Sequence, residues 1–196
     1  MGTDGGLKNT AAGGLGGLEA LLREQAGDLL PPVDKWDPPY CGDIGMRIRS
    51  DGVWFYQGSP IGRKPLVRLF SRVLRRDLDG KHYLVTPIEK VDVAVDDAPF
   101  LAVEMEVSGH GTGQVLTFRT NVDDVVRCDG THPLRFVPEP HSGGLKPYLL
   151  VRGRLEALVT RAVYYDLVEL AAPDREEADA PLGIWSGGVF FPLAAG

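Results

Sequence analysis

Cysteine is scarce in this chain, with only Cys41 and Cys128 among 196 residues. Small secreted domains that depend on disulfides carry several cysteines at regular spacing. Two isolated cysteines do not make such a framework. Two reduced thiols in a reducing compartment are the simpler interpretation.

Long apolar runs are also missing. No stretch approaches the run of about 18 to 20 apolar residues that a membrane-spanning helix requires. Residues 1–17 contain seven glycines and no basic start followed by an apolar segment, so a secretory signal is not expected either. Both absences predict a cytoplasmic protein without a membrane partner.

Sequence motifs of catalysis and metal binding are lacking as well. Cys128 and His132 have ligand-like spacing, but a closed zinc site needs four convergent ligands. The glycines of segment 109–113 lack the following lysine and helix of a phosphate loop, and Ser186 lacks the pattern of a nucleophile elbow. The sequence predicts no metal, no cofactor and no catalytic residue.

The net charge is −6, from 21 Lys and Arg against 27 Asp and Glu. This balance does not favour a surface that coats nucleic acid. Hydrophobic residues make up 43% of the chain and charged residues 24%, which is typical of globular proteins. Nothing in the composition indicates an oligomeric state.

The order of patterns predicts three segments. Residues 1–35 combine a flexible glycine-rich tail with a short helix that has leucines at helical spacing. Residues 36–97 are expected to form an N-terminal α+β domain. Residues 98–196 are expected to form a β-rich C-terminal domain with one helix.

The first domain combines strands that alternate polar and apolar residues with one amphipathic helix. Asp51-Gly52 is typical of a hairpin turn. The helix should begin near Pro65, and its apolar stripe extends from Leu66 to Leu74. Strands are expected at 46–50, 53–56, 82–86 and 91–95.

In the second domain, apolar and polar residues mostly alternate with a period of two, which is typical of strands. Its helix is expected over 155–170, although Val163, Tyr164 and Tyr165 also favour a strand. Strands are expected at 100–107, 114–121, 125–128, 134–137, 148–152 and 183–193.

The two halves also resemble each other. Gly62-Arg63 precedes one amphipathic helix and Gly153-Arg154 precedes the other. The sequence therefore predicts an α+β fold with a duplicated strand–helix–strand core and mostly antiparallel sheets. The halves should meet at about residues 95–98.

Several short motifs occur in an order that resembles a bacterial family, domain of unknown function 1285, over roughly residues 36–193. The motifs are residues 51–54, 59–63, 66–70, 86–90, 97–100, Arg152, Arg161, 164–165 and 185–187. The resemblance implies a duplicated core and a C-terminal half that is superficially like a pleckstrin-homology barrel. It also implies a nucleotide-like ligand between the halves and a role in signal transduction. Phosphoinositide binding is not implied, because a helix followed by a last strand is not the usual ending of that barrel.

The strongest charge signal is a basic helix. Residues 62–76 contain six Lys and Arg and no acid. Arg68, Arg72, Arg75 and Arg76 would share one face and repel one another. Two explanations are open. Carboxylates elsewhere, such as Glu89, Glu104 or Glu106, neutralise them, or the face binds phosphate or another anion.

The aromatic residues also allow two interpretations. Trp36, Trp54, Trp185 and the pair Tyr164-Tyr165 are either core residues or surfaces on which a base stacks. Glu89 is either the partner of an arginine or a ligand contact. We expect Arg63 and Arg68, supported by Arg152 and Arg161, to face the junction and bind an anionic group. Arg72, Arg75 and Arg76 should lie further along the helix and serve solubility or a partner. The candidate ligand-binding residues are therefore Arg63, Arg68, Arg152, Arg161, Trp54, Glu89 and Trp185.

These expectations favour a ligand-binding module for a small anionic, nucleotide-like molecule at the interface between the halves. A hydrolase or transferase acting on a phosphorylated small molecule is the alternative. A third candidate is a protein-interaction module whose basic face meets an acidic partner. Binding is favoured over catalysis because the sequence offers arginines and aromatics but no pair of nucleophile and base.

Overall fold

The computed structural model describes residues 15–24, 30–139, 143–173 and 180–193. Most of the glycine-rich tail predicted for residues 1–17 lies outside these ranges. The short helix predicted before residue 36 is α1, Leu15–Glu24. None of the helices in the described ranges is long and apolar enough to span a membrane.

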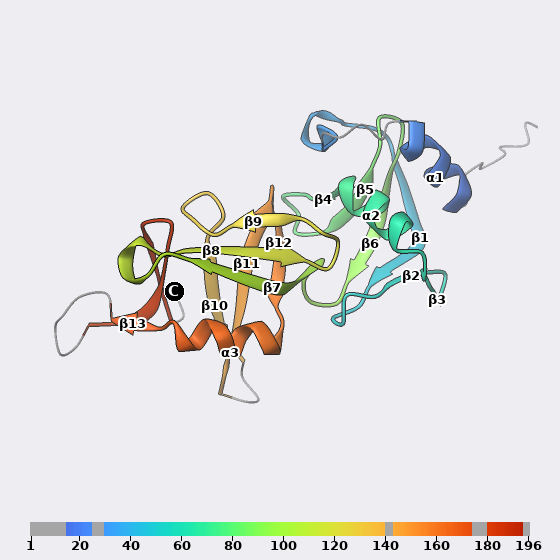
Figure 1. Ribbon diagram of the computed structural model, residues 1–196. Coiled ribbons are helices and arrows are strands. Elements are labelled where there is room, and N and C mark those ends of the chain that lie inside the picture. The colour runs from blue at the N-terminus through green and yellow to red at the C-terminus, as the bar shows by residue number, and fades with distance from the viewer. Residues whose placement is uncertain (1–14, 25–29, 140–142, 174–179, 194–196) are drawn as a thin grey trace, which may run out of the picture.

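The first half of the chain forms a six-stranded sheet with one helix (Figure 1). The order across the sheet is β3-β2-β1-β6-β5-β4. Helix α2, Lys64–Arg72, connects β3 to β4 and buries Leu66 and Phe70. The Phe70 ring stacks on Trp54 of β2 with 6.4 Å between centroids. The strands are β1 (Tyr40–Ile48), β2 (Trp54–Tyr56), β3 (Ser59–Pro60), β4 (Leu74–Arg76), β5 (His82–Val85) and β6 (Lys90–Val95).

The second half forms another six-stranded sheet, in the order β10-β11-β12-β7-β8-β9. Helix α3, Arg161–Glu169, follows β12 and buries Val163 and Leu167. A small sheet of β13 (Ala172–Pro173), β14 (Leu182–Ser186) and β15 (Val189–Pro192) lies at the end of the molecule distant from the first half (Figure 1). The strands of the large sheet are β7 (Phe100–Ser108), β8 (Val115–Thr120), β9 (Val125–Arg127), β10 (Leu134–Pro138), β11 (Leu145–Arg152) and β12 (Leu155–Val159).

The two large sheets have the same topology, which confirms the predicted duplication. Each contains two three-stranded antiparallel meanders, and the first strand of one meander pairs in parallel with the last strand of the other. The parallel pairs are β1 with β6 and β7 with β12. The α+β class and the mostly antiparallel sheets are also confirmed. The C-terminal sheet curls with α3 along one end, as the superficial likeness to a pleckstrin-homology barrel implies (Figure 1).

The repeated unit is longer than the sequence predicts, and its helices are not equivalent. Helix α2 lies between the third and fourth strands of its sheet, whereas α3 follows the sixth. The dipeptide Gly153-Arg154 turns β11 into β12 and does not precede a helix. The correspondence between Gly62-Arg63 and Gly153-Arg154 is therefore wrong.

Three predicted boundaries are wrong. In two of them, residues whose hydrophobic pattern fits both a helix and a strand form a strand. Helix α2 ends at Arg72, and Leu74 to Arg76 pair with β5. The first five residues of the helix predicted at 155–170 form β12, in which Leu155, Ala157 and Val159 are buried alternately. The single strand predicted at 183–193 is the hairpin of β14 and β15.

The chain passes from the first sheet to the second over residues 96–99, and side chains join the halves on both sides of this crossing. Asn121, after β8, donates its side-chain amide to the carbonyl of Gly52 at 3.5 Å. Its amide oxygen accepts the backbone N–H of Leu101 at 3.0 Å. Gly52 therefore packs directly on the second half.

Adding a methyl group at Gly52 should loosen this contact. A Cβ there would lie 2.7 Å from Asn121 Nδ2 and 2.9 Å from Leu101 Cδ1. Gly58 is a matched control, because its φ of 79° nearly equals the 78° of Gly52 and no atom lies within 4 Å of its added Cβ. Both alanine variants carry the same left-handed backbone strain of about 1–2 kcal/mol. Crowding should lower the free energy of unfolding of Gly52→Ala by about 1 kcal/mol more. Urea denaturation measures the difference, and equal losses would contradict this contact.

Candidate functional site

Two of the predicted arginines reach the junction, and each is paired there with a carboxylate of the second half. Arg68 of α2 forms an ion pair with Asp123, which also pairs with Arg119 at 3.0 Å. Arg152 at the end of β11 pairs with Asp124. Carboxylates therefore neutralise part of the basic cluster, as one of the two explanations expects. The partners lie in the turn between β8 and β9 and are not the glutamates proposed from the sequence.

Arg152 makes further contacts that join the halves. Its Nη2 donates to the backbone carbonyl of Ser71 in the first half at 2.7 Å. Its guanidinium lies over the Phe100 ring, 4.9 Å from the centroid. Only 19% of the side chain is exposed. Such a multiply bonded, mostly covered arginine stabilises the junction and has little capacity left for a ligand.

The other two predicted arginines lie away from the junction. Arg63 precedes α2 and pairs with Glu19 of α1 at 2.9 Å. Arg161 begins α3 and donates to the Tyr165 hydroxyl at 2.9 Å. The four arginines therefore do not converge on one cleft, because α2 and α3 occupy different places in their repeats.

The aromatic candidates and Glu89 lie apart as well. Trp54 is 1% exposed in the core, and its Nε1 has no hydrogen-bond partner among the described residues. Trp185 lies in β14 and packs on Phe190, with 5.2 Å between centroids. Glu89 lies in the turn between β5 and β6, and the structure records no side-chain partner for it in the described ranges. Trp54 belongs to the first six-stranded sheet, whereas Trp185 belongs to the small three-stranded sheet outside the repeat.

Arg75 and Arg76 do not continue the basic helix but belong to β4. Arg75 is 11% exposed and pairs with Asp77 at 2.6 Å. Its Nη1 donates to the carbonyls of Val33 and Trp36, both at 2.7 Å. The expectation that Arg75 serves solubility or a partner is therefore wrong, because this side chain fastens residues 33–36 to the first sheet.

Arg76 and Arg154 face a cavity of about 140 Å³ between the halves. The Arg76 Nε donates to the carbonyl of Gly80 at 3.2 Å, and Arg154 Nη1 lies 3.4 Å from the backbone carbonyl of Arg76. The structure records no carboxylate partner for either guanidinium within the part of the chain that it describes. The candidate site is centred on these two arginines.

The acidic groups of this cavity already have cations of their own. Glu156 pairs with Arg135 at 2.5 Å, and Asp97 pairs with Lys146 at 3.0 Å. The Arg135 guanidinium also covers the Tyr148 ring at 4.6 Å. These two carboxylates are therefore not ion-pair partners of Arg76 or Arg154.

His82 also lines the cavity. Burial and the nearby charge of Arg76 lower the pKa of His82 from 6.5 to about 4. The imidazole is therefore neutral at physiological pH and can donate or accept one hydrogen bond at each nitrogen.

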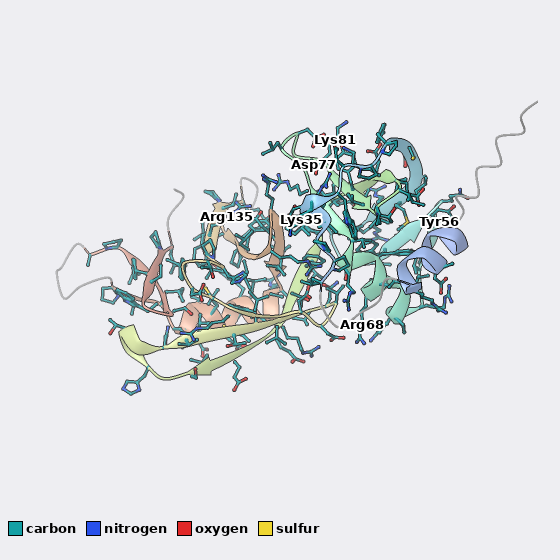
Figure 2. The ribbon with its side chains drawn as sticks, turned by 90° about the horizontal axis from the view of Figure 1, so that it is seen from above. Lys35, Tyr56, Arg68, Asp77, Lys81 and Arg135 are labelled. Carbon is teal, nitrogen blue, oxygen red and sulfur yellow. The ribbon has the colours of Figure 1, made fainter. Side chains whose placement is uncertain are left out.

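Two further cavities adjoin Arg154, one of about 210 Å³ and one of about 770 Å³. The smaller also includes Arg76 and Arg152. The larger is lined by Trp36 and by four aspartates. Asp77 pairs with Arg75 and Asp79 accepts the Tyr83 hydroxyl, whereas no partner is recorded among the described residues for the side chains of Asp34 and Asp37. Figure 2 shows Arg135 and Asp77 toward one side of the junction and Arg68 at the other. The hollowed side is thus the side opposite the Arg68–Asp123 pair.

Sequence reasoning missed Arg154 because the glycine before it suggested the start of a helix. The pattern of alternating residues on both sides of Gly153-Arg154 was the available signal for a hairpin turn. The described residues contain no group of three or more His, Cys, Asp or Glu that could hold a metal ion.

Models of one protein family match nearly the whole chain. The N-terminal domain of DUF1285, a domain of unknown function, matches residues 31–98, and the C-terminal domain of the same family matches residues 99–193. A DUF1285 family protein of Silicibacter pomeroyi is 48% identical with a TM-score of 0.82, over 91% of this chain and 94% of that chain. A DUF1285 family protein of Shewanella baltica is 26% identical with a TM-score of 0.50, over 64% of this chain and 91% of that chain. No curated protein matches the chain.

Arg152 should contribute to stability, whereas the nearby Arg154 should contribute little to it. Arg152→Ala leaves Asp124 and the Ser71 carbonyl without their partner, which should lower the free energy of unfolding by about 2–3 kcal/mol. Arg154→Ala removes an exposed side chain and should change stability by less than about 0.5 kcal/mol. Chemical denaturation of both variants measures this contrast. A stable Arg152→Ala protein would show that the halves are held by other contacts.

His82 should make stability depend on pH. Its folded-state pKa of about 4 lies below the value of about 6.5 in an unfolded chain. The unfolded state therefore binds the proton first, and stability falls as the pH is lowered from about 6.5 toward 4. Replacement by Gln should flatten this decline between about pH 7 and pH 5, above the range in which most carboxylates titrate. Thermal unfolding of both proteins across that range is the measurement, and parallel curves would contradict a half-buried, neutral His82.

Proposed function

The chain belongs to the DUF1285 family, a family of unknown function, and on that premise we propose that it is a ligand-binding module. Its ligand is a small anionic, nucleotide-like molecule held between the two halves. The observation that supports this most is the pair Arg76 and Arg154. These guanidinium groups come from different halves, face one cavity and have no recorded carboxylate partner in the described ranges.

An anion is the natural complement of this pair. Guanidinium groups bind phosphate oxygens two at a time, and such charge-assisted hydrogen bonds are stronger than neutral ones. The neutral imidazole of His82 in the same cavity adds a hydrogen-bonding group without adding charge. The site thus favours a phosphate over a bulky apolar group.

The adjoining large cavity supports the nucleotide-like character. Its volume of about 770 Å³ lies in the range of about 300–1,000 Å³ that is usual for small-molecule sites. Trp36 provides an aromatic face on which a planar ring can stack. Asp34 and Asp37, whose side chains have no recorded partner within the described ranges, provide acceptors for ring N–H groups. Arg154 borders both cavities, so one molecule can reach both.

A role in signal transduction fits a ligand held between two halves. The ligand would contact Arg76 in the first half and Arg154 in the second. It would therefore stabilise whichever relative arrangement of the halves brings both groups to it. Such differential stabilisation is what a sensor module requires.

A hydrolase or transferase for a phosphorylated molecule is the alternative. His82 is a neutral group of the cavity that could accept a proton, whereas Asp97 and Glu156 are held in ion pairs. A pKa of about 4 makes it a weak base near neutral pH, and we propose no reaction through it.

The test begins with a thermal-shift screen of nucleoside mono- and diphosphates, sugar phosphates and inorganic phosphate. The compound with the largest shift is then titrated by calorimetry into the wild type, Arg76→Ala and Arg154→Ala. Each variant should bind about ten- to a hundredfold more weakly, because each lost charge-assisted hydrogen bond contributes about 1.5–3 kcal/mol. Arg127→Ala removes an exposed arginine of β9 and should bind like the wild type.

Arg68→Gln distinguishes two places for the site. Its guanidinium pairs with Asp123 on the other side of the junction, so affinity should change little. A loss confined to Arg68→Gln would place the site there instead. The absence of a shift with every anion would favour the protein-interaction module, and conversion of the titrated compound would favour the enzyme.

A further inference from the structure

A separate pocket of about 350 Å³ lies between α3 and the hairpin of β10 and β11. It shares no lining residue with the three cavities of the junction. Its apolar lining includes Leu145, Pro147, Leu158 and Val159. Two tyrosines of α3, Tyr164 and Tyr165, complete its aromatic wall. The volume lies within the range of about 300–1,000 Å³ that small-molecule sites occupy.

Arg161 was a candidate for the junction and the two tyrosines were candidates for stacking on a base, and the structure brings all three together here. Tyr165 is 55% exposed. The Arg161 guanidinium lies 5.7 Å from the centre of the Tyr165 ring, and its Nε donates to the Tyr165 hydroxyl at 2.9 Å. The pocket therefore combines an apolar interior with an oriented cation.

Arg161 is the cation of this pocket whose charge is not neutralised. Lys146 is paired with Asp97 at 3.0 Å and lies 3.6 Å from Glu139. For Arg161, the structure records Tyr165 but no carboxylate within the residues that it describes. Glu139 also lines the pocket, on the side of Lys146. An anionic group that enters thus finds the Arg161 guanidinium, which has no recorded carboxylate partner in the described ranges, beside apolar side chains.

We propose that this pocket binds a small molecule with an apolar body and one carboxylate group. The apolar body would cover the lining that includes Leu145 and Leu158, and the carboxylate would accept hydrogen bonds from Arg161. An amine with the same body would be repelled by the guanidinium. Inorganic phosphate would gain the charge contact but no apolar burial. The ligand class follows from this pairing and does not depend on the function proposed for the junction.

Three probes with the same eight-carbon tail test the proposal: octanoate, 1-octanol and octylamine. Each is titrated, below its aggregation concentration, into ¹⁵N-labelled full-length protein and followed by amide chemical shifts. Octanoate should shift the amides of Leu145, Leu158 and Tyr164 and bind at least tenfold more tightly than octylamine, with octanol between them. Equal binding of the three probes would overturn the carboxylate. Shifts confined to other parts of the molecule would overturn the pocket.

Arg161→Gln should weaken octanoate binding about tenfold and leave octanol binding unchanged, because only the charged contact is lost. Arg161 is an exposed residue of α3, so the variant should keep the wild-type spectrum elsewhere. Arg127→Gln is the matched control and should bind octanoate like the wild type. If Arg161→Gln binds octanoate as tightly as Arg127→Gln does, the proposal is wrong. This result would say nothing about anion binding by Arg76 and Arg154. The two proposals can therefore fail independently.

Discussion

Arg152 makes the contacts on which the arrangement of the junction most depends. This one side chain, in the second half, pairs with Asp124, donates to the Ser71 carbonyl of the first half and covers Phe100. An arginine has five donors in a fixed plane, so it can hold several acceptors in one defined arrangement, whereas the ammonium of a lysine is a compact point charge with three donors. Since Arg154 lies two residues further along the same hairpin, the contacts of Arg152 also determine where Arg154 meets Arg76.

The duplicated topology explains why a site forms at this place. β4 is the edge strand of the first sheet, so its arginines are not all covered by neighbouring strands. The turn between β11 and β12 projects from the second sheet toward that edge, as the contact of Arg154 with the Arg76 carbonyl shows. An exposed edge is usually protected by charge. Here Arg76 of the first half and Arg154 of the second half lie at one cavity. An anion would complement their positive charges.

The sequence predicts the fold class well because its strongest patterns are local. The Asp51-Gly52 turn, the stripe from Leu66 to Phe70 and the alternation in β6 each determine one element without help from distant residues. Predicted boundaries are wrong where the hydrophobic pattern fits both a helix and a strand, as at Leu155 to Val159. There the pairing of β12 with β7 and β11 stabilises the strand. The site is harder to predict, because the partner of an arginine depends on tertiary contacts. Arg68 and Arg76 look alike in the sequence, yet Asp123 neutralises only Arg68.

The central parallel pairs also constrain how the chain folds. In each sheet the two meanders are joined only through the first and last strands, such as Met46 with Val93 and Phe100 with Ala157. Contacts between residues so far apart in sequence must wait for closure of a long loop, which slows folding. During synthesis the first sheet can close once β6 has left the ribosome, whereas the second must wait for β12. An early first half would then present the β4 edge before its partner exists, which makes that edge the point at which a nascent chain is most exposed to wrong pairing.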